Sequence, residues 1–157
     1  MAIVVKSGKQ LAEVVNNRIK QHVRKEGQRF LHVLREEVLK YYNSYEPSIY
    51  NRHWGMYNSI RIDPVEVKQN RIGIRIYFES GMATRPSLFG GRQGFAPGLI
   101  NYGWTWKRKR GPYRLAYYEG FNFMRKAIDR WNVDNKYGLK IQSTWFHGGT
   151  IIRREGN

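Results

Sequence analysis

Apolar residues recur at steps of three, four and seven from Ser7 to about Asn43, and this pattern most constrains the fold. It predicts one long amphipathic helix with Leu11, Val15, Ile19, Val23, Phe30, Leu34, Val38 and Tyr41 on one side. Ser7 and Gln10 form an S-x-x-Q capping box at its start. Gly27 indicates either a kink or a break into two helices. An unbroken helix of roughly 37 residues would be about 55 Å long, so we expect it to protrude, bend or pack on a neighbour.

A β-hairpin is expected after the helix. Pro47 ends the helical pattern, because the residue before a proline avoids helical angles. Alternating apolar residues then predict two strands joined by a turn at Gln69-Asn70, with a change of phase at Asp63-Pro64: Ile60, Ile62, Val65 and Val67, then Ile72, Ile74, Ile76 and Phe78.

The rest of the chain reads as a loop, a strand, a helix and a last strand. Residues 80–98 contain five glycines and two prolines, so we expect a long functional or flexible loop. Further elements are predicted at Tyr102–Trp106 (strand), Phe121–Trp131 (helix) and Leu139–Trp145 (strand), followed by a Gly148-Gly149 turn and a basic tail. The predicted class is α+β, with a long N-terminal helix, a small antiparallel sheet, a shorter helix and a final strand in one domain of residues 1–157.

The excess of positive charge implies an acidic partner. Lys and Arg number 28 against 12 Asp and Glu, a formal net charge of +16. Solubility does not require so much charge, and self-repulsion costs stability, so we expect nucleic acid, an anionic membrane or an acidic protein to offset it. The chain has no cysteine and no apolar run long enough to cross a bilayer, and its opening MAIVVK is too short for a signal-peptide core. We therefore expect a soluble protein that is not exported by a cleavable signal.

The sequence contains no recognisable catalytic constellation. The histidines His22, His32, His53 and His147 form no metal-binding pair, and the glycines of residues 80–98 match no phosphate-binding loop. We expect no enzyme activity, metal or cofactor. A small ribonuclease remains an alternative, with His53 among Tyr50, Arg52 and Tyr57 as its candidate centre.

Two basic stretches are candidate contacts with the acidic partner. The first is Lys107, Arg108, Lys109 and Arg110, which follows the rings of Tyr102, Trp104 and Trp106; the second is Arg153 and Arg154. Cations with interleaved rings can hold single-stranded nucleic acid. The three rings fit equally well a strand face packed on the core, so a nucleic-acid-binding protein is also an alternative.

The stretch YEPSIYNRHWGMYNSI, residues 45–60, resembles a motif of the tail-component (neck) protein family of long-tailed bacteriophages. The matching residues are Tyr45, Pro47, Tyr50, Arg52, Ser59 and Ile60, with Met56 at a leucine position. The order of elements over about residues 8–132 is also similar, and GFNFMRKAIDRW (120–131) resembles the family's closing helix. The chain departs from the family in having His53-Trp54 where a small Thr-Gly pair is usual, in its long 80–98 loop, and in an extension at 133–157.

The resemblance implies a structural virion protein. Such proteins are ring subunits at the neck or upper tail, joining head and tail around the DNA channel, and would be assembled in the cytoplasm of the bacterial host. The expected partners are further copies in a ring, acidic neighbouring neck and tail proteins, and the DNA in the channel. Tyr45, Tyr50, Arg52, Trp54 and Tyr57 would then form an aromatic corner between helix and sheet, either internal to the subunit or at a subunit contact.

Overall fold

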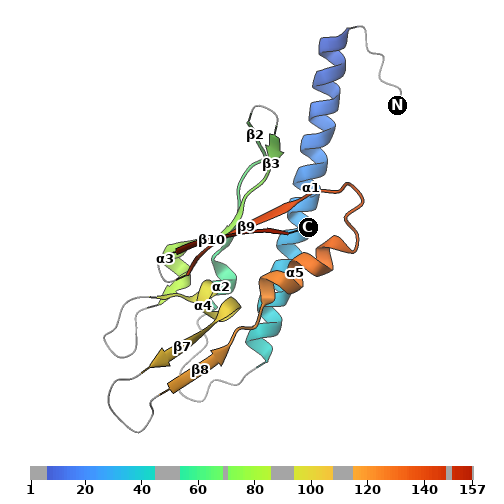
Figure 1. Cartoon of the computed structure of the whole chain (residues 1–157). Helices are drawn as coiled ribbons and strands as arrows, with labels where there is room; N and C mark the ends of the chain where they lie inside the picture. Colours follow the sequence, from blue (N-terminus) through green and yellow to red (C-terminus); the bar gives the residue numbers. More distant parts are fainter. Residues whose placement is uncertain are drawn as a thin grey trace.

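The computed structural model describes residues 7–44, 54–68, 71–85, 94–107, 115–147 and 150–156. At 84–85, 94–95, 99, 104–107, 115–118, 142–147 and 150–156 the description covers the backbone alone. The α+β class is confirmed. Figure 1 shows a long helix whose N-terminal part extends beyond the other elements, while the hairpins and shorter helices lie along the rest of it.

The long helix is α1 (Gly8–Asn43), and the prediction of its start is confirmed. The Ser7 hydroxyl accepts a hydrogen bond from the Gln10 amide at 3.3 Å, which satisfies one of the free amides at the helix start. At the other end the Ser44 amide and hydroxyl both donate to the Tyr41 carbonyl. The helix therefore ends before Pro47, which lies outside the described residues.

Gly27 neither kinks nor breaks α1, which runs through it unbroken. The side chain of Ile74, from the β-hairpin, packs directly over this glycine, and a β-carbon there would lie 2.8 Å from the Ile74 Cγ2 atom. The glycine is thus explained by close packing of helix and hairpin rather than by a change in helix direction.

The predicted β-hairpin is present in two parts. β1 (Ile60–Ile62) pairs antiparallel with β4 (Ile76–Phe78), and β2 (Glu66–Lys68) with β3 (Arg71–Gly73). The expected phase change at Asp63-Pro64 falls in the gap between the two ladders, where the Asp63 amide donates to the Arg75 carbonyl at 2.9 Å. The short helix α2 (Gly55–Asn58) leads into β1.

Residues 80–98 are not simply a loop. They include α3 (Ser80–Ala83), the two-residue ladder of β5 (Thr84–Arg85) with β6 (Gly94–Phe95), and the start of α4 (Ala96–Tyr102). Tyr102 therefore ends a helix rather than beginning a strand. Gly103, at φ 79°, supplies the left-handed turn from α4 into the next strand, a conformation that favours glycine.

Two further hairpins complete the described chain. β7 (Gly103–Lys107) pairs antiparallel with β8 (Leu115–Glu119), a strand that sequence analysis did not predict. β9 (Ile141–His147) confirms the last predicted strand, but the predicted basic tail is itself a strand, β10 (Thr150–Gly156), paired along the length of β9. Between these hairpins lies α5 (Phe123–Asn132), the predicted shorter helix.

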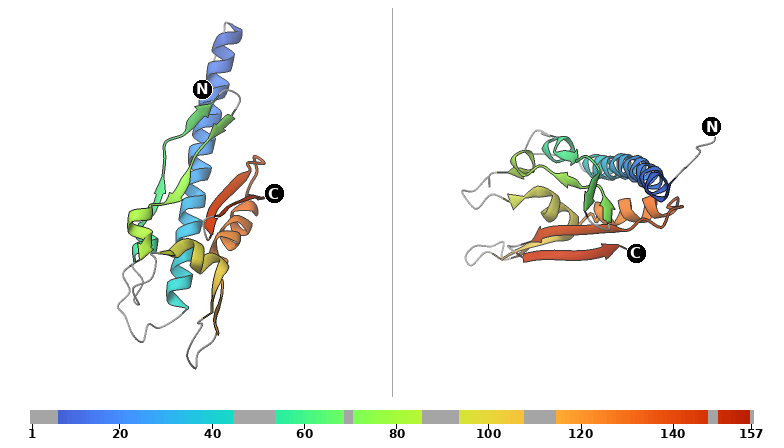
Figure 2. Two further views of the ribbon diagram at one scale, coloured as in Figure 1. Left: turned by 60° about the vertical axis from the view of Figure 1, so that its left-hand side comes forward. Right: turned by 90° about the horizontal axis from the view of Figure 1, so that it is seen from above.

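The core lies where the second half of α1 meets α5, α2 and β1. Its buried residues include Phe30, Leu34, Val38, Tyr42, Met56, Ile60, Phe123, Ala127 and Trp131. In the left view of Figure 2 the β1–β4 strands lie on one side of α1, and α5 with the β9–β10 hairpin on the other. Within the described residues, no helix is long and apolar enough to cross a membrane.

Candidate interaction surface

The aromatic corner is partly described. The Trp54 ring lies 4.8 Å from that of Tyr42 at the end of α1 and 6.4 Å from that of Tyr57, centroid to centroid. The Arg35 guanidinium lies over the Tyr57 ring at 6.0 Å. These contacts join the end of α1 to α2 within one chain. Tyr45, Tyr50 and Arg52 lie outside the described residues, as does His53.

The two predicted basic stretches fall on the two C-terminal hairpins. Lys107 is the last residue of β7, so Arg108, Lys109 and Arg110 fall between that strand and β8; these three lie outside the described residues. Arg153 and Arg154 are in β10, opposite Thr144 and Ser143 of β9. The side chains of Lys107, Arg153 and Arg154 are outside the description, so their contacts with a partner stay a prediction.

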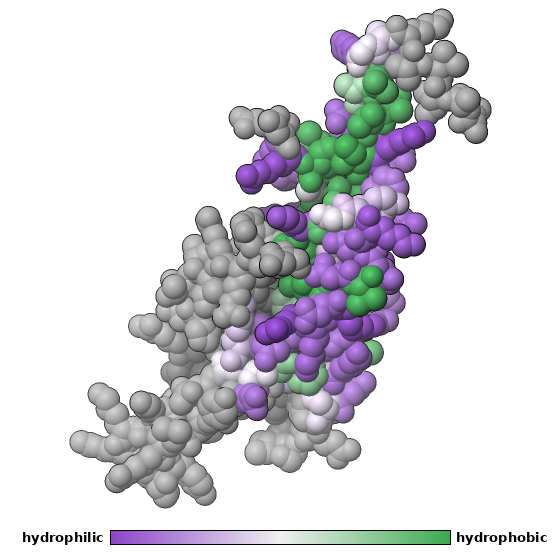
Figure 3. Space-filling view, turned by 45° about the vertical axis from the view of Figure 1, so that its right-hand side comes forward, coloured by the Kyte–Doolittle hydropathy of each residue, from purple (hydrophilic) through white to green (hydrophobic). Residues whose placement is uncertain are grey.

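The first half of α1 is a surface that sequence analysis misjudged in part. We call residues 8–25 the α1 limb, because this part of the helix extends beyond most of the molecule (Figure 1). Leu11, Val15 and Ile19 were predicted to lie on the packed face, yet they are 52%, 45% and 40% exposed. Only from Val23 onward is that face buried. Figure 3 shows hydrophobic residues gathered along this upper part of the molecule.

Uncompensated cations accompany this apolar row. The α1 limb carries five basic residues and one acidic residue, Glu13. Among the described residues, none of the five makes an ion pair: Lys9, Arg18, Lys20, Arg24 and Lys25. The helix's length was the sequence signal for this surface, but it left protrusion, bending and packing on a neighbour open and did not say which residues would be uncovered.

The body below the α1 limb is held by ion pairs between α1 and α5. Arg130 of α5 donates to Glu37 at 2.5 Å and to Glu36 at 2.7 Å, and Lys40 donates to Glu37 at 2.7 Å. Burial raises the pKa of Glu37, but the hydrogen bonds from Lys40 and Arg130 outweigh it and hold this pKa below its ordinary value. The Arg130 hydrogen bond is the main cause of the lowered pKa of Glu36.

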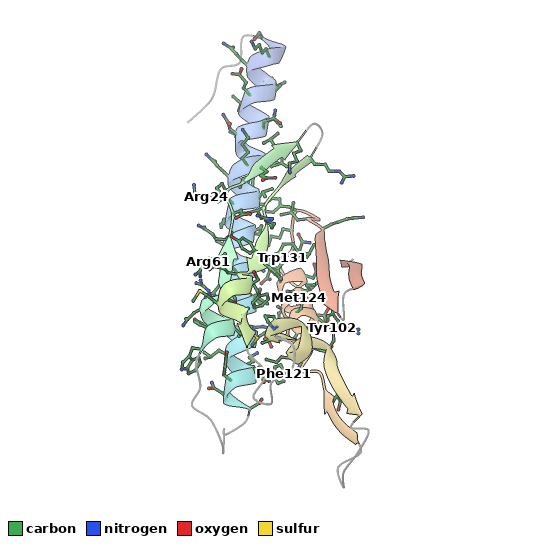
Figure 4. All side chains as sticks on the ribbon, turned by 90° about the vertical axis from the view of Figure 1, so that its left-hand side faces the viewer. Arg24, Arg61, Tyr102, Phe121, Met124 and Trp131 are labelled. Atoms are coloured by element: carbon green, nitrogen blue, oxygen red, sulfur yellow. The ribbon has the colours of Figure 1, made fainter. Side chains whose placement is uncertain are left out.

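A second set of contacts fixes both ends of α5 to its neighbours. At one end Arg29 donates to the Trp131 carbonyl at 2.9 Å and lies over the Trp131 ring. At the other, the buried Asn101 side chain of α4 accepts a hydrogen bond from the Met124 amide at 2.9 Å, which takes the place of a side-chain cap from Asn122. Figure 4 shows Trp131, Met124 and Phe121 along this helix and its entry.

Within the part of the chain that is described, no three His, Cys, Asp or Glu side chains gather as a metal site. A hollow of about 240 Å³ on the β2–β3 hairpin is lined by the hairpin's own residues, among them Glu66, Lys68, Arg71 and Arg75. The described histidines on α1 have partners: His32 contacts Glu36 at 3.0 Å, and the His22 ring lies tilted against the Tyr137 ring, 4.6 Å between centroids.

No protein-family model matches the chain, and no curated protein or solved structure matches it at the level of significance required.

Proposed function

We propose that the chain is a non-enzymatic structural subunit of a tailed-bacteriophage virion, a neck or tail-completion protein that forms part of a ring joining head and tail around the DNA channel. The proposal rests on the resemblance of residues 45–60 to the neck-family motif and on the order of long helix, hairpin, strand and shorter helix over residues 8–132. Its place would be the virion neck or tail, after assembly in the cytoplasm of the bacterial host.

The observation that carries the proposal is the α1 limb. The apolar row of the α1 limb is half-exposed, on a part of the helix that extends beyond most of the molecule. Cations without ion-pair partners among the described residues lie on the same part of the helix. Together they make a surface suited to binding another macromolecule. A subunit that functions only in an assembly would have such a surface, with its counter-charge on a neighbour.

Charge limits how such a ring could form. About six copies would bring together on the order of a hundred positive charges, which must be offset by acidic neighbours or by DNA. Cations facing the channel would slow the passage of DNA, so acidic neighbouring proteins are the favoured source of counter-charge. Lys107, Arg108, Lys109, Arg110, Arg153 and Arg154 are further candidates to contact them, and unchanged assembly after Lys107–Arg110 are replaced by alanine would remove that stretch from the proposal.

The first test is the mass of the purified chain in solution at physiological salt, with and without a short DNA duplex. The expected result is either a ring of defined mass or a monomer. In both cases the mass should be the same with and without the duplex. A monomer that binds the duplex with sub-micromolar affinity would refute the proposal.

The second candidate is a nucleic-acid-binding protein, favoured by the excess of cations and the basic stretch beside Trp104 and Trp106. Its affinity for DNA or RNA would fall steeply with salt as counterion release is suppressed. A ribonuclease is the third, and it requires RNA cleavage that His53→Ala abolishes.

A further inference from the structure

We infer that the α1 limb is the docking surface for a different, acidic protein that presents apolar side chains, and not for a second copy of the chain. The inference deepens the proposed function and rests on it in one respect, which is that the partner is a protein of the same assembly. It assigns to the α1 limb the acidic contact that sequence analysis placed on the basic stretches at 107–110 and 153–154.

The apolar part of the surface continues a packed face. Leu11, Val15, Ile19 and Val23 lie four residues apart, and Val23 is buried where the hairpin begins to cover α1. The same row is therefore packed from Val23 onward and exposed at Leu11, Val15 and Ile19. Since four residues exceed one turn of 3.6, the row winds around the helix by about 40° per step. A partner helix would then cross the α1 limb at an angle, as ridges of four-residue spacing do, rather than run along it as a coiled coil.

The partner's charge follows from the residues beside this row. The five cations of the α1 limb, which form no ion pair among the described residues, share this length of helix with the row, whereas Glu13 is the sole carboxylate of the limb. A partner that buried the apolar row would bring its own rim against these cations. Carboxylates in that rim would be attracted and speed the encounter, whereas cations would be repelled.

Within the described residues, a second copy has few free carboxylates to supply. Among the described side chains, eight carboxylates are already in ion pairs within the chain: Glu26, Glu36, Glu37, Asp63, Glu66, Glu79, Asp129 and Asp134. Of the described carboxylates this leaves Glu13 and Glu119. Pairing of two copies through the α1 limb would place cations against cations with little to compensate them.

The other two acidic surfaces fit the apolar row less well. Phosphates of a nucleic acid would pair with the cations but leave Leu11, Val15 and Ile19 in water. A helix lying on a membrane surface commonly anchors with Trp, Phe or Leu, and residues 8–25 contain one leucine and no Phe, Tyr or Trp. An acidic protein with an apolar ridge satisfies both parts of the surface.

The test uses the full chain and a synthetic helical peptide with leucines at every fourth position and glutamates beside them, labelled for fluorescence anisotropy. The row variant L11Q/V15Q/I19Q removes the apolar row, and V67Q/V133Q removes two exposed apolar residues from other elements as its control. All changed residues are exposed, so circular dichroism should be the same for each variant. We expect the peptide to bind, the row variant to weaken binding about tenfold or more, and the control to leave it unchanged.

Several outcomes would overturn the inference. These are no binding of the peptide, equal binding by the row variant, equal binding of a peptide with serines for leucines, or self-association that the row variant abolishes. The inference would also be overturned if the full chain bound vesicles of anionic lipid more strongly than it binds the peptide. The short duplex separates the two proposals: duplex binding by the wild-type chain refutes the neck-protein function, whereas peptide binding insensitive to the row refutes the docking surface alone.

Discussion

Replacing Gly27 with alanine sets two effects of opposite sign against each other in the middle of α1. Alanine favours the helix over glycine by roughly 0.5–1 kcal/mol. The new β-carbon, however, would lie 2.8 Å from Cγ2 and 3.0 Å from Cδ1 of Ile74, and 3.6 Å from Cδ1 of Ile62. The Cγ2 atom is bonded to the Ile74 β-carbon, so it moves only if the whole side chain turns or the hairpin shifts. Such overpacking costs typically about 1–3 kcal/mol.

The cost of overpacking should therefore exceed the gain in helix preference, and G27A should lower the free energy of unfolding by about 1 kcal/mol. The measurement is urea unfolding of the full chain followed by circular dichroism. G8A is the matched control, because a β-carbon at Gly8 meets no atom within 4 Å, and its stability should be unchanged or slightly higher. In an I74A background the clash is removed, so there G27A should raise stability by about 0.5–1 kcal/mol.

If Ile74 packs on Gly27, the effect of G27A on stability must change sign between the wild-type chain and the I74A chain. If G27A were stabilising in the wild-type chain, or equally destabilising with and without the Ile74 side chain, the hairpin would not pack on α1 as described. The explanation of this glycine would then be wrong.

Three other changes test the body of the molecule by urea or thermal unfolding. R130Q should cost about 1–3 kcal/mol, because it removes one of two cations from the buried Glu37, and the loss should shrink in an E37Q background. Since the pKa of Glu37 is lowered on folding, its contribution is present above the ordinary value of 4.5 and is lost as pH falls through the lowered folded value; the loss should be smaller in E37Q, where Glu36 still has a lowered pKa. N101A should cost about 1–2 kcal/mol by leaving the Met124 amide without its acceptor, and N101D should recover most of this. G120A should cost about 3 kcal/mol, because its β-carbon would overlap the backbone of Asn101 and the next two residues, which cannot swing aside.

The sequence predicted those elements whose pattern reflects burial on one side. The apolar periodicity of α1 and α5, the Ser7 cap and the alternation of the β1–β4 hairpin all express local rules, and each is found in the structure. The same rules could not show which neighbour covers a face. Leu11 and Phe30 belong to one periodic pattern, yet Phe30 is buried against Trp131 and Leu11 is half-exposed.

The elements that were missed depend on pairing rather than on pattern. β8 has no clear alternation, and it is a strand because β7 lies beside it. β10 carries Arg153 and Arg154 and was predicted to be a basic tail, but its backbone pairs with β9 from Thr150 to Gly156. Of the predicted aromatic corner the structure describes two members, Trp54 and Tyr57, whose ring centroids lie 6.4 Å apart.

The uncovered α1 limb has a consequence for amide hydrogen exchange. Its helical hydrogen bonds continue those of the body, but a helix of its length is marginal in water without tertiary packing. We therefore expect protection to fall along α1 from Val23 toward Gly8, as the free end unwinds and reforms while the core stays closed. A partner seated on Leu11, Val15 and Ile19 would hold this end wound, so the residues that gain protection on assembly would mark the length of the contact.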